Sequence, residues 1–312
     1  MTNPIPVLCL CGPTGAGKTA ASLALAETFG GEVVNIDSRQ IYRDFPIITA
    51  QPSVLEQSRC PHHLFGFART EDSLGAGQYA EVTEGVVHAI HGRGGLPILV
   101  GGTGLYIRAL FDGVAPIPPV PAEVRQHWVD RYAAIGPKLH EELLRVDPQS
   151  AARLHPNDKQ RIARALEVWE YTGKTLTEWH TAPVEVPAFK PLFLGIRRTL
   201  AALEPLLARR IGMMLDAGAI EEAEQAKTLC DDPESPGWSG IGCREMWLYL
   251  EGAVSLDECR RLWLKNTRAY AKRQLTWFNA DKRILWHAPE VIETMLATAE
   301  EFLREQMERV RQ

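Results

Sequence analysis

Short, continuous apolar runs alternate with helix-like stretches in the first part of the chain. The runs 5–10 and 96–100 are apolar throughout, which is typical of parallel strands that are buried on both faces. The runs 32–36 and 192–196 predict two further strands, and 20–28, 78–91 and 105–111 predict helices between them. This order predicts an α/β fold, a parallel sheet flanked by helices.

The pattern changes after residue 115. Four prolines between 116 and 121 predict a stiff linker, and 122–182 is amphipathic and helical. Its clearest helix begins with Asn157 as the predicted N-cap and carries an apolar stripe at helical spacing, listed as Ile162, Ala165, Leu166 and Trp169. We therefore expect an α/β core formed by 1–117 and 196–312, with 118–195 as a helical insertion domain.

The last third of the chain is mainly helical, and one helix in it is basic. No acidic residue occurs between Arg260 and Ala280, and a cationic stripe is expected from Arg261, Lys265, Arg268 and Lys272. Tyr270, Trp277 and Phe278 are interleaved with it, a mixture that suits single-stranded nucleic acid. Two other interpretations stay open, a solvated face for the cations and core packing for the aromatic rings. The runs 284–287 and 289–311 predict an edge strand and a surface helix.

Composition limits the class of protein. The chain has 312 residues, of which 45% are apolar, and its length indicates about two domains. A net charge of −5 predicts neither nucleic-acid nor membrane binding, so a polyanion would need local basic patches. Six cysteines show no zinc or C-x-x-C spacing, and no signal peptide or run of 18 apolar residues is found. We expect a cytoplasmic protein with reduced thiols and no membrane association.

The first apolar run leads into a glycine-rich loop of the form G-x-x-x-x-G-K-T. Strand, glycine loop and helix follow one another, which is the context that this motif requires. Its backbone amides curl around phosphate groups, the helix N-terminus and the lysine add positive charge, and the threonine can bind magnesium. The motif predicts a P-loop NTPase-like site for a nucleotide or another diphosphate, formed by Gly12, Pro13, Thr14, Gly15, Ala16, Gly17, Lys18 and Thr19.

Polar residues follow two other predicted strands. Asp37 comes directly after 32–36, and Thr103 lies in the glycine turn 101–104 after 96–100. Because the carboxyl ends of parallel strands line one crevice, we expect both side chains beside the phosphate loop. From its spacing alone, Asp37 is as compatible with a turn or cap as with catalysis. The pair His62-His63 is interpreted as structural, since neighbouring side chains in a strand point to opposite faces.

Together these segments resemble the bacterial tRNA dimethylallyltransferase family, which prenylates the adenosine beside the anticodon. The similarity spans nearly the whole chain and keeps the family's order. Besides the phosphate loop, the matching segments are Asp37-Ser38-Arg39-Gln40-Ile41-Tyr42-Arg43, Pro61-His62-His63-Leu64, 99–106, His155-Pro156-Asn157-Asp158, 160–161, 164–167, 173–175, Gly240-Ile241-Gly242, 244–245 and Lys272-Arg273-Gln274-Leu275-Thr276-Trp277-Phe278.

The resemblance implies a substrate pair and roles for individual residues. The loop would hold the diphosphate of dimethylallyl diphosphate, with Mg²⁺ at Thr19 and Lys18 as a cation. Asp37 would bind the amine of the target adenine and accept its proton, assisted by Thr103. Contacts with the tRNA anticodon loop are implied for Asp37, Ser38, Arg39, Gln40, Thr103, Arg125, Gln160, Arg161, Arg164, Gly242, Arg244, Lys272, Arg273, Gln274 and Trp277. We expect a monomer.

Three positions depart from the family pattern. Cys243 stands where tyrosine is usual, so stacking from that position is in doubt. Ser239 stands where some members carry an arginine near the diphosphate, so another cation must compensate or the affinity for diphosphate is lower. Arg39 replaces a smaller or apolar residue.

Three other functions stay open at this level. A P-loop kinase would use ATP with the same loop, but no acidic residue follows the strand 96–100 as a Walker-B motif requires. A tRNA-binding module without catalysis would need neither Asp37 nor Thr103. An adenylate-prenylating relative would have less use for the basic helix and for 160–164.

Overall fold

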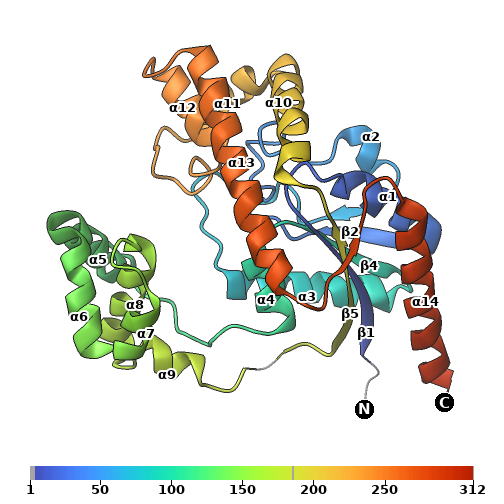
Figure 1. The fold of residues 1–312 in the computed structure, drawn as a ribbon, viewed down its shortest axis with the longest axis horizontal. Helices are drawn as coiled ribbons and strands as arrows, with labels where there is room; N and C mark the ends of the chain where they lie inside the picture. Colours follow the sequence, from blue (N-terminus) through green and yellow to red (C-terminus); the bar gives the residue numbers. More distant parts are fainter. Residues whose placement is uncertain (1–3, 185, 312) are drawn as a thin grey trace. The chain divides into compact units, whose positions relative to one another are not determined.

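The computed structural model describes residues 4–184 and 186–311, and it contains a six-stranded sheet in which every paired strand is parallel (Figure 1). The spatial order is β3-β2-β4-β1-β5-β6. The strands are β1 (Ile5–Cys11), β2 (Gly31–Asn35), β3 (His62–His63), β4 (Leu96–Gly101), β5 (Phe189–Ile196) and β6 (Leu285–His287). The predicted α/β class is confirmed, and β1 lies in the interior of the sheet, where its apolar run is buried on both faces.

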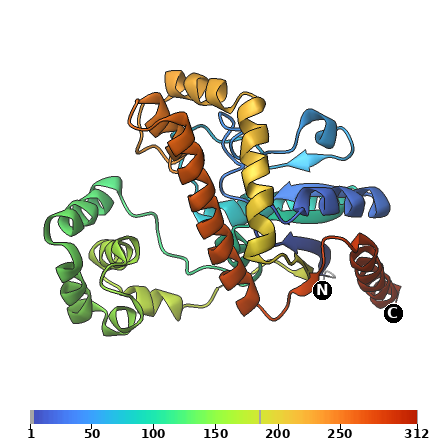
Figure 2. The same cartoon turned by 45° about the horizontal axis from the view of Figure 1, so that its top comes forward.

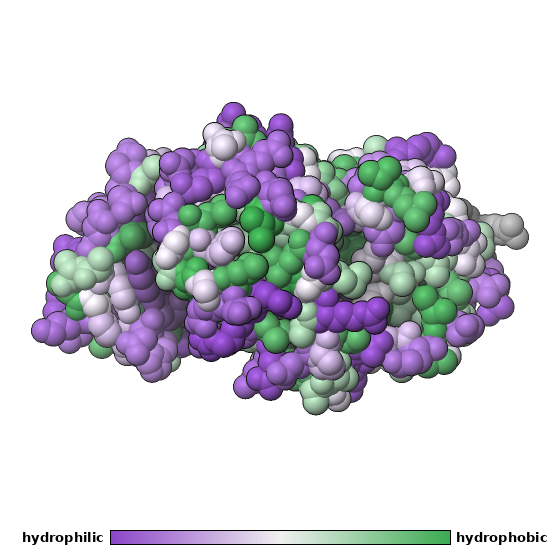
Figure 3. Space-filling view, turned by 90° about the horizontal axis from the view of Figure 1, so that it is seen from above, coloured by the Kyte–Doolittle hydropathy of each residue, from purple (hydrophilic) through white to green (hydrophobic). Residues whose placement is uncertain are grey.

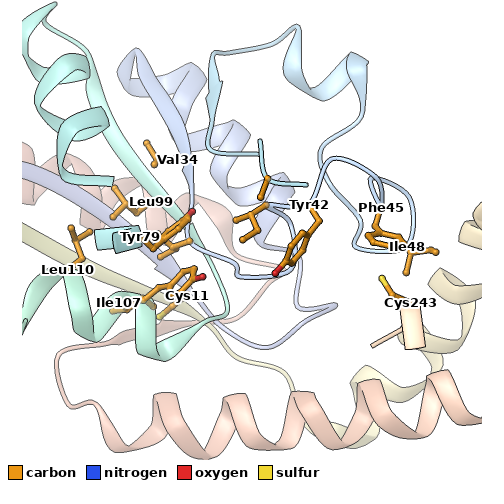
Figure 4. Packing of buried hydrophobic residues seen from close by; sticks show 14 of the residues in the cluster. Cys11, Val34, Tyr42, Phe45, Ile48, Tyr79, Leu99, Ile107, Leu110 and Cys243 are labelled. Atoms are coloured by element: carbon orange, nitrogen blue, oxygen red, sulfur yellow. The ribbon is translucent and has the colours of Figure 1, made fainter. Parts of the chain in front are cut away.

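Helices cover both faces of this sheet. Val7, Cys9 and Cys11 of β1 face one cluster, which also takes in residues of α3, α4 and α11–α13, while Leu8 and Leu10 face α1 and α14. Figure 4 shows part of the first cluster, with Tyr79, Leu99 and Ile107 packed close together. The helices of the chain outside residues 113–186 are α1 (Lys18–Phe29), α2 (Val54–Gln57), α3 (Ala76–Gly92), α4 (Gly104–Phe111), α10 (Leu200–Asp216), α11 (Ala219–Leu229), α12 (Cys243–Leu250), α13 (Leu256–Ala280) and α14 (Ile292–Arg311), of which α2 has no buried residue.

The short edge strand β3 contains the pair His62-His63. Its His63 donates a hydrogen bond from Nε2 to the ionised Glu32 carboxylate, with 2.7 Å between Nε2 and Oε2, and Arg93 forms an ion pair with the same carboxylate. Glu32 belongs to β2 and is 8% exposed. The two-histidine motif therefore contributes to an ion-pair network at the sheet edge, which agrees with the structural interpretation.

The chain forms two compact units, 1–112 with 187–312, and 113–186. Among its described residues the second unit has helices and no strand, and its bounds, 113–186, differ at both ends from the predicted 118–195. At the later end the reason is that β5 pairs with β1 along its length, so residues from 189 onward belong to the sheet. The helices of the second unit are α5 (Ala122–Ile135), α6 (Leu139–Val146), α7 (Pro148–Arg153), α8 (Lys159–Thr172) and α9 (Leu176–His180), with a 3₁₀ turn at Gly136–Lys138.

The second unit has its own apolar core, in which Trp128, Leu139 and Leu143 pack against α8. Three predicted stripe residues of α8 are buried there, but Trp169 is 37% exposed, which corrects that part of the prediction. The N-cap of α8 is Asp158, one residue later than predicted, and its carboxylate accepts the amide of Arg161 at 3.2 Å.

Hydrophilic residues surround separate apolar patches on the face shown in Figure 3. Among residues 4–184 and 186–311, no helix combines the length and the apolar character that a membrane span needs.

Candidate active site

The phosphate loop connects β1 to α1, and its shape depends on glycine. Gly12, Gly15 and Gly17 have φ angles of 145°, 78° and 104°, a region that L-amino acids rarely adopt. A Cβ at Gly12 would also lie 2.9 Å from the carbonyl oxygen of Ile196. The loop therefore packs on the end of β5, and the N-terminus of α1 faces the space that the loop encloses.

Lys18 is the first residue of α1 and reaches back over this loop. Its Nζ donates to the carbonyl oxygens of Gly12 and Pro13, both at 3.0 Å. Burial lowers the pKa of Lys18 to about 8, and the Asp37 carboxylate opposes that shift. An ammonium group held among carbonyls without a close counter-ion is arranged to receive an anion.

Asp37 follows β2 and is fixed by the backbone around it. Its N–H donates to Oδ1 of Asn35 at 2.8 Å, and its own Oδ1 accepts the N–H of Arg39 at 2.9 Å. Asn35 is fully buried, and its amide also donates to the carbonyl of Leu64 at 2.9 Å. Asn35 was not singled out in the sequence, because nothing distinguishes a strand-end asparagine before its partners are known.

The glycine turn after β4 packs directly on the Asp37 loop. A Cβ at Gly101 would lie 2.4 Å from the carbonyl carbon of Ile36, so no larger residue fits there. Thr103 accepts the backbone N–H of Ser38 through Oγ1 at 2.9 Å. Because β2, β4 and β1 are parallel neighbours in the sheet, the phosphate loop, Asp37 and Thr103 follow the ends of three adjacent strands and lie at the same edge.

One face of α13 packs on the two glycine turns at this edge of the sheet. Tyr270 is hydrogen-bonded to Thr103. Burial raises the pKa of the Tyr270 phenol, and the charge of Asp37 raises it further. Gln274 is hydrogen-bonded to both glycine turns, and the indole of Trp277 lies against Gly104. Phe278 is buried in the core, as one interpretation of these aromatic residues held, whereas Trp277 remains 43% exposed.

A second cation of the site was missed in the sequence. Arg210 lies on α10 beside α13 (Figures 1 and 2), and burial lowers its pKa while the Asp37 carboxylate opposes the shift. Its charge also acts on Lys18. In the sequence it is one arginine of an amphipathic helix, and only the packing of α10 brings it to the phosphate loop.

The cationic stripe on the outer face of α13 is partly neutralised. Arg261 pairs with Glu258 of the same helix at 2.5 Å, and Arg268 pairs with Glu204 of α10 at 2.9 Å. Among the described residues, Lys272 forms no ion pair, and the Arg273 guanidinium lies 5.7 Å from the ring centroid of Tyr270. Lys272 and Arg273 are thus exposed cations next to Gln274, which bonds to both glycine turns.

Two residues implied to contact tRNA are buried instead, which argues against a direct contact. Gly242 has φ of 95°, and a Cβ there would lie 2.7 Å from Ile48 and Trp263. Gln274 is 4% exposed. Two others have partners within the chain, since the Gln40 amide donates to the carbonyl of Ala50 at 2.6 Å and Arg244 to that of Pro233 at 3.0 Å.

The departures from the family pattern are explained by packing. Cys243 is completely buried, so this side chain does not stack on a ligand. The Arg39 guanidinium donates to Ser239 Oγ at 3.0 Å and to the carbonyl of Pro236 at 3.2 Å. The position where some members carry an arginine is therefore occupied by a guanidinium from another loop.

The remaining predicted tRNA residues belong to the helical unit. Glu167 is 3% exposed and pairs with Arg164 at 2.5 Å, while Arg125 lies 3.9 Å from it. Arg161 pairs with Asp158 at 3.5 Å. Gln160 is exposed at the start of α8. These groups share one end of α8, but their binding to RNA stays a prediction.

The residues around Thr19 fit a magnesium ion of the phosphate-bound type. Among residues 4–184 and 186–311, no group of three or more His, Cys, Asp or Glu side chains is arranged to bind a metal. Mg²⁺ often needs few protein ligands, because it keeps several waters and takes phosphate oxygens. The partly exposed Thr19 hydroxyl follows Lys18 on α1 and is suited to that role.

A parallel sheet whose interior strand leads into this loop defines a P-loop NTPase-like protein. The family model described as IPP transferase matches residues 40–281. The chain belongs to this family. A relative from Nitratidesulfovibrio vulgaris, named tRNA dimethylallyltransferase, is 53% identical, and the match covers 97% of this chain and 99% of the relative. A relative of the same name from Oleidesulfovibrio alaskensis is 56% identical, and the match covers 90% of this chain and 93% of the relative.

Solved structures of the family agree with this assignment. The tRNA isopentenylpyrophosphate transferase of Bacillus halodurans is 30% identical, covers 98% of this chain and 99% of its own, and gives a TM-score of 0.71. A eukaryotic dimethylallyltransferase, described as acting on tRNA, is 29% identical, covers 91% and 74%, and gives a TM-score of 0.77. The prediction of the family and of a prenyltransferase activity is confirmed.

Proposed function

We propose that this enzyme transfers the dimethylallyl group of dimethylallyl diphosphate to the exocyclic amine of the adenosine adjacent to the anticodon of tRNA, and releases pyrophosphate. The observation that supports the proposal is that the phosphate loop, Asp37 and Thr103 follow the ends of three neighbouring parallel strands at one sheet edge. A diphosphate and an amine-binding carboxylate in one crevice are what this alkyl transfer needs.

The phosphate loop stabilises the leaving group. Its amides and the Lys18 ammonium would bind the diphosphate, and the charge of the Arg210 guanidinium, which acts on Lys18 and Asp37, would add to the stabilisation of the negative charge that builds up as the carbon–oxygen bond breaks. Mg²⁺ bound through Thr19 would add a Lewis acid for the same charge.

Asp37 acts on the other reactant. The adenine amine is a weak nucleophile, because its lone pair is delocalised into the ring. The Asp37 carboxylate keeps one oxygen on the amide of Arg39, which leaves the other to orient the amine and accept its proton. Thr103 holds the loop through Ser38 and offers its own oxygen to the same amine. The base must leave the anticodon stack to reach them, at a cost of a few kcal/mol.

The test combines dimethylallyl diphosphate with an unmodified anticodon stem-loop and measures prenyl incorporation. A second stem-loop carries another base in place of the target adenine, and parallel reactions replace the prenyl donor with ATP or the RNA with AMP. We expect incorporation only with the adenine and no ATP hydrolysis. Prenylation of AMP at the rate of the stem-loop, or ATP turnover in place of alkyl transfer, would contradict the proposal.

Asp37→Ala tests the carboxylate separately. We expect turnover to fall about 10²–10⁴-fold, the usual worth of a positioned proton acceptor. Binding of the stem-loop should change little, and a filter-binding titration measures it. A near-normal rate would remove Asp37 from the mechanism.

The tRNA interface is tested through charge. Lys272→Glu should weaken RNA binding and reduce the dependence of log Kd on log salt, since one phosphate contact contributes a slope of about 0.7–0.9. The matched control is Arg304→Glu on α14, a helix on the opposite face of the sheet. Equal salt slopes for wild type and Lys272→Glu would mean that this residue is only solvated.

We further propose that Mg²⁺ is the cofactor and that the enzyme acts as a cytoplasmic monomer.

A further inference from the structure

A buried glutamine of α13 links the two glycine turns. Gln274 accepts the backbone N–H of Thr14 through Oε1 at 2.8 Å and donates from Nε2 to the carbonyl oxygen of Gly102 at 2.9 Å. Its side chain is 4% exposed. One amide thus bonds at the same time to the phosphate loop after β1 and to the turn after β4.

The backbone amide of Thr14 connects the phosphate loop to α13. Pro13 has no N–H, so Thr14 carries the first amide after Gly12. That amide is directed at Gln274, so it anchors the loop. The remaining amides of the loop are then held in the position that the anion requires. Leaving either end of the Gln274 amide without a partner would be costly, because a buried polar group loses its hydrogen bond to water as well.

The second turn leaves no room for another arrangement. A Cβ at Gly102 would lie 2.1 Å from Nε2 of Gln274, and a Cβ at Gly104 would lie 2.0 Å from Nε1 of Trp277. Between them, Thr103 is hydrogen-bonded to Tyr270. Three successive residues of the turn are therefore matched by three side chains on one face of α13.

We propose that Gln274 is a positioning residue that sets the phosphate loop relative to the Gly102–Thr103 turn. It would touch neither substrate, and it would fix the separation between the diphosphate and the amine held at Asp37 and Thr103. The inference deepens the proposed function and rests on it, because the loop must bind a diphosphate for its position to matter.

The experiment measures pyrophosphate binding by calorimetry with the full chain and no tRNA, and then KM for dimethylallyl diphosphate and kcat. Gln274→Met keeps the length of the side chain and removes both hydrogen bonds. We expect its pyrophosphate affinity to fall and its KM to rise, each about tenfold, as the loss of a buried hydrogen bond implies. Gln274→Asn is one methylene shorter and should give a smaller loss. Stem-loop affinity should be unchanged in both.

The matched control is Thr276→Ala, an exposed position on the same helix, for which no change is expected. All assays run well below the melting temperature of each variant. A purely structural glutamine would lower that temperature and leave pyrophosphate affinity and KM at wild-type values, which would overturn the inference. Wild-type protein that fails to bind pyrophosphate would instead overturn the role of the loop itself. Gln274→Asn keeps the test open if the methionine variant does not fold.

Discussion

The phosphate loop after β1 and the glycine turn after β4 lie side by side at one edge of the sheet, and both are rich in glycine. In the first, Gly12, Gly15 and Gly17 all have positive φ angles. In the second, Gly101 and Gly102 do not, and a Cβ on either would collide with neighbouring atoms at 2.1–2.4 Å. Glycine in the loop serves a backbone shape that binds an anion, whereas glycine in the turn allows close packing of β2 and α13.

Under the proposed function, this difference would assign one reactant to each turn. The loop, with Lys18, would bind the diphosphate leaving group, and the turn, with Thr103, would support the amine. Changes in the loop should therefore affect diphosphate binding, and changes in the turn should affect stability or the acceptor step.

The largest effect is expected for Lys18→Met. It removes the ammonium that faces the developing charge, and turnover should fall about 10²–10³-fold, as when one preorganised donor is lost. Pyrophosphate affinity should fall as well, whereas stem-loop binding should not. Calorimetry and single-turnover prenylation measure the two. Turnover above a tenth of the wild-type rate would separate the lysine from the leaving group.

Alanine at Gly102 should act mainly on stability. The new Cβ overlaps Gln274, and overpacking of this kind costs about 1–3 kcal/mol of unfolding free energy. Gly85→Ala, inside α3 with no atom within 4 Å of the new Cβ, is the control and should stabilise the protein by about 0.5–1 kcal/mol. Urea unfolding measures both. In a Gln274→Ala background, where the overlapping atoms are gone, the cost of Gly102→Ala should shrink, and strict additivity would mean that the overlap is not with Gln274.

A change at Thr103 should affect the acceptor step alone. Thr103→Val keeps the shape and removes the oxygen that accepts the N–H of Ser38. We expect kcat to fall about tenfold, the worth of a buried hydrogen bond, with pyrophosphate affinity unchanged. Thr103→Ser, which keeps the hydroxyl, should recover most of the rate. A rise in KM for the prenyl donor with an unchanged kcat would contradict the division between the two turns.

The pH dependence of diphosphate binding should be a smaller effect than the loss of Lys18. Burial holds the pKa of Lys18 at about 8 in the free enzyme, and a bound anion favours its protonated form. Affinity should therefore be constant below the pKa and fall by up to about tenfold per pH unit above it, because binding then requires uptake of a proton. Lys18→Arg should remove this dependence, since guanidinium stays charged. Wild-type affinity independent of pH between 7 and 9.5 would place the pKa elsewhere.

Much of the site was readable from local sequence. The phosphate loop is a contiguous motif, and its backbone shape follows from glycine at fixed positions. Asp37 and Thr103 were found because each follows an apolar run, and the ends of parallel strands meet at one edge. The strands β1, β2, β4 and β5 were likewise predicted, because a strand that is buried on both faces appears in the sequence as a continuous apolar run.

Tertiary packing decided the rest. Arg210 and Asn35 have no local signal, and Gln274 was expected to contact tRNA, because the role of each depends on partners far along the chain, such as the amide of Thr14 for Gln274. The same holds for β3, only two residues long, and for the end of the helical unit, which pairing of β5 with β1 moves to residue 186. A sequence determines which short stretches can form strands, helices and an anion cradle. Which distant side chain completes that cradle depends on packing, since hydrogen bonds and steric fit act between atoms in space and not between neighbours in sequence.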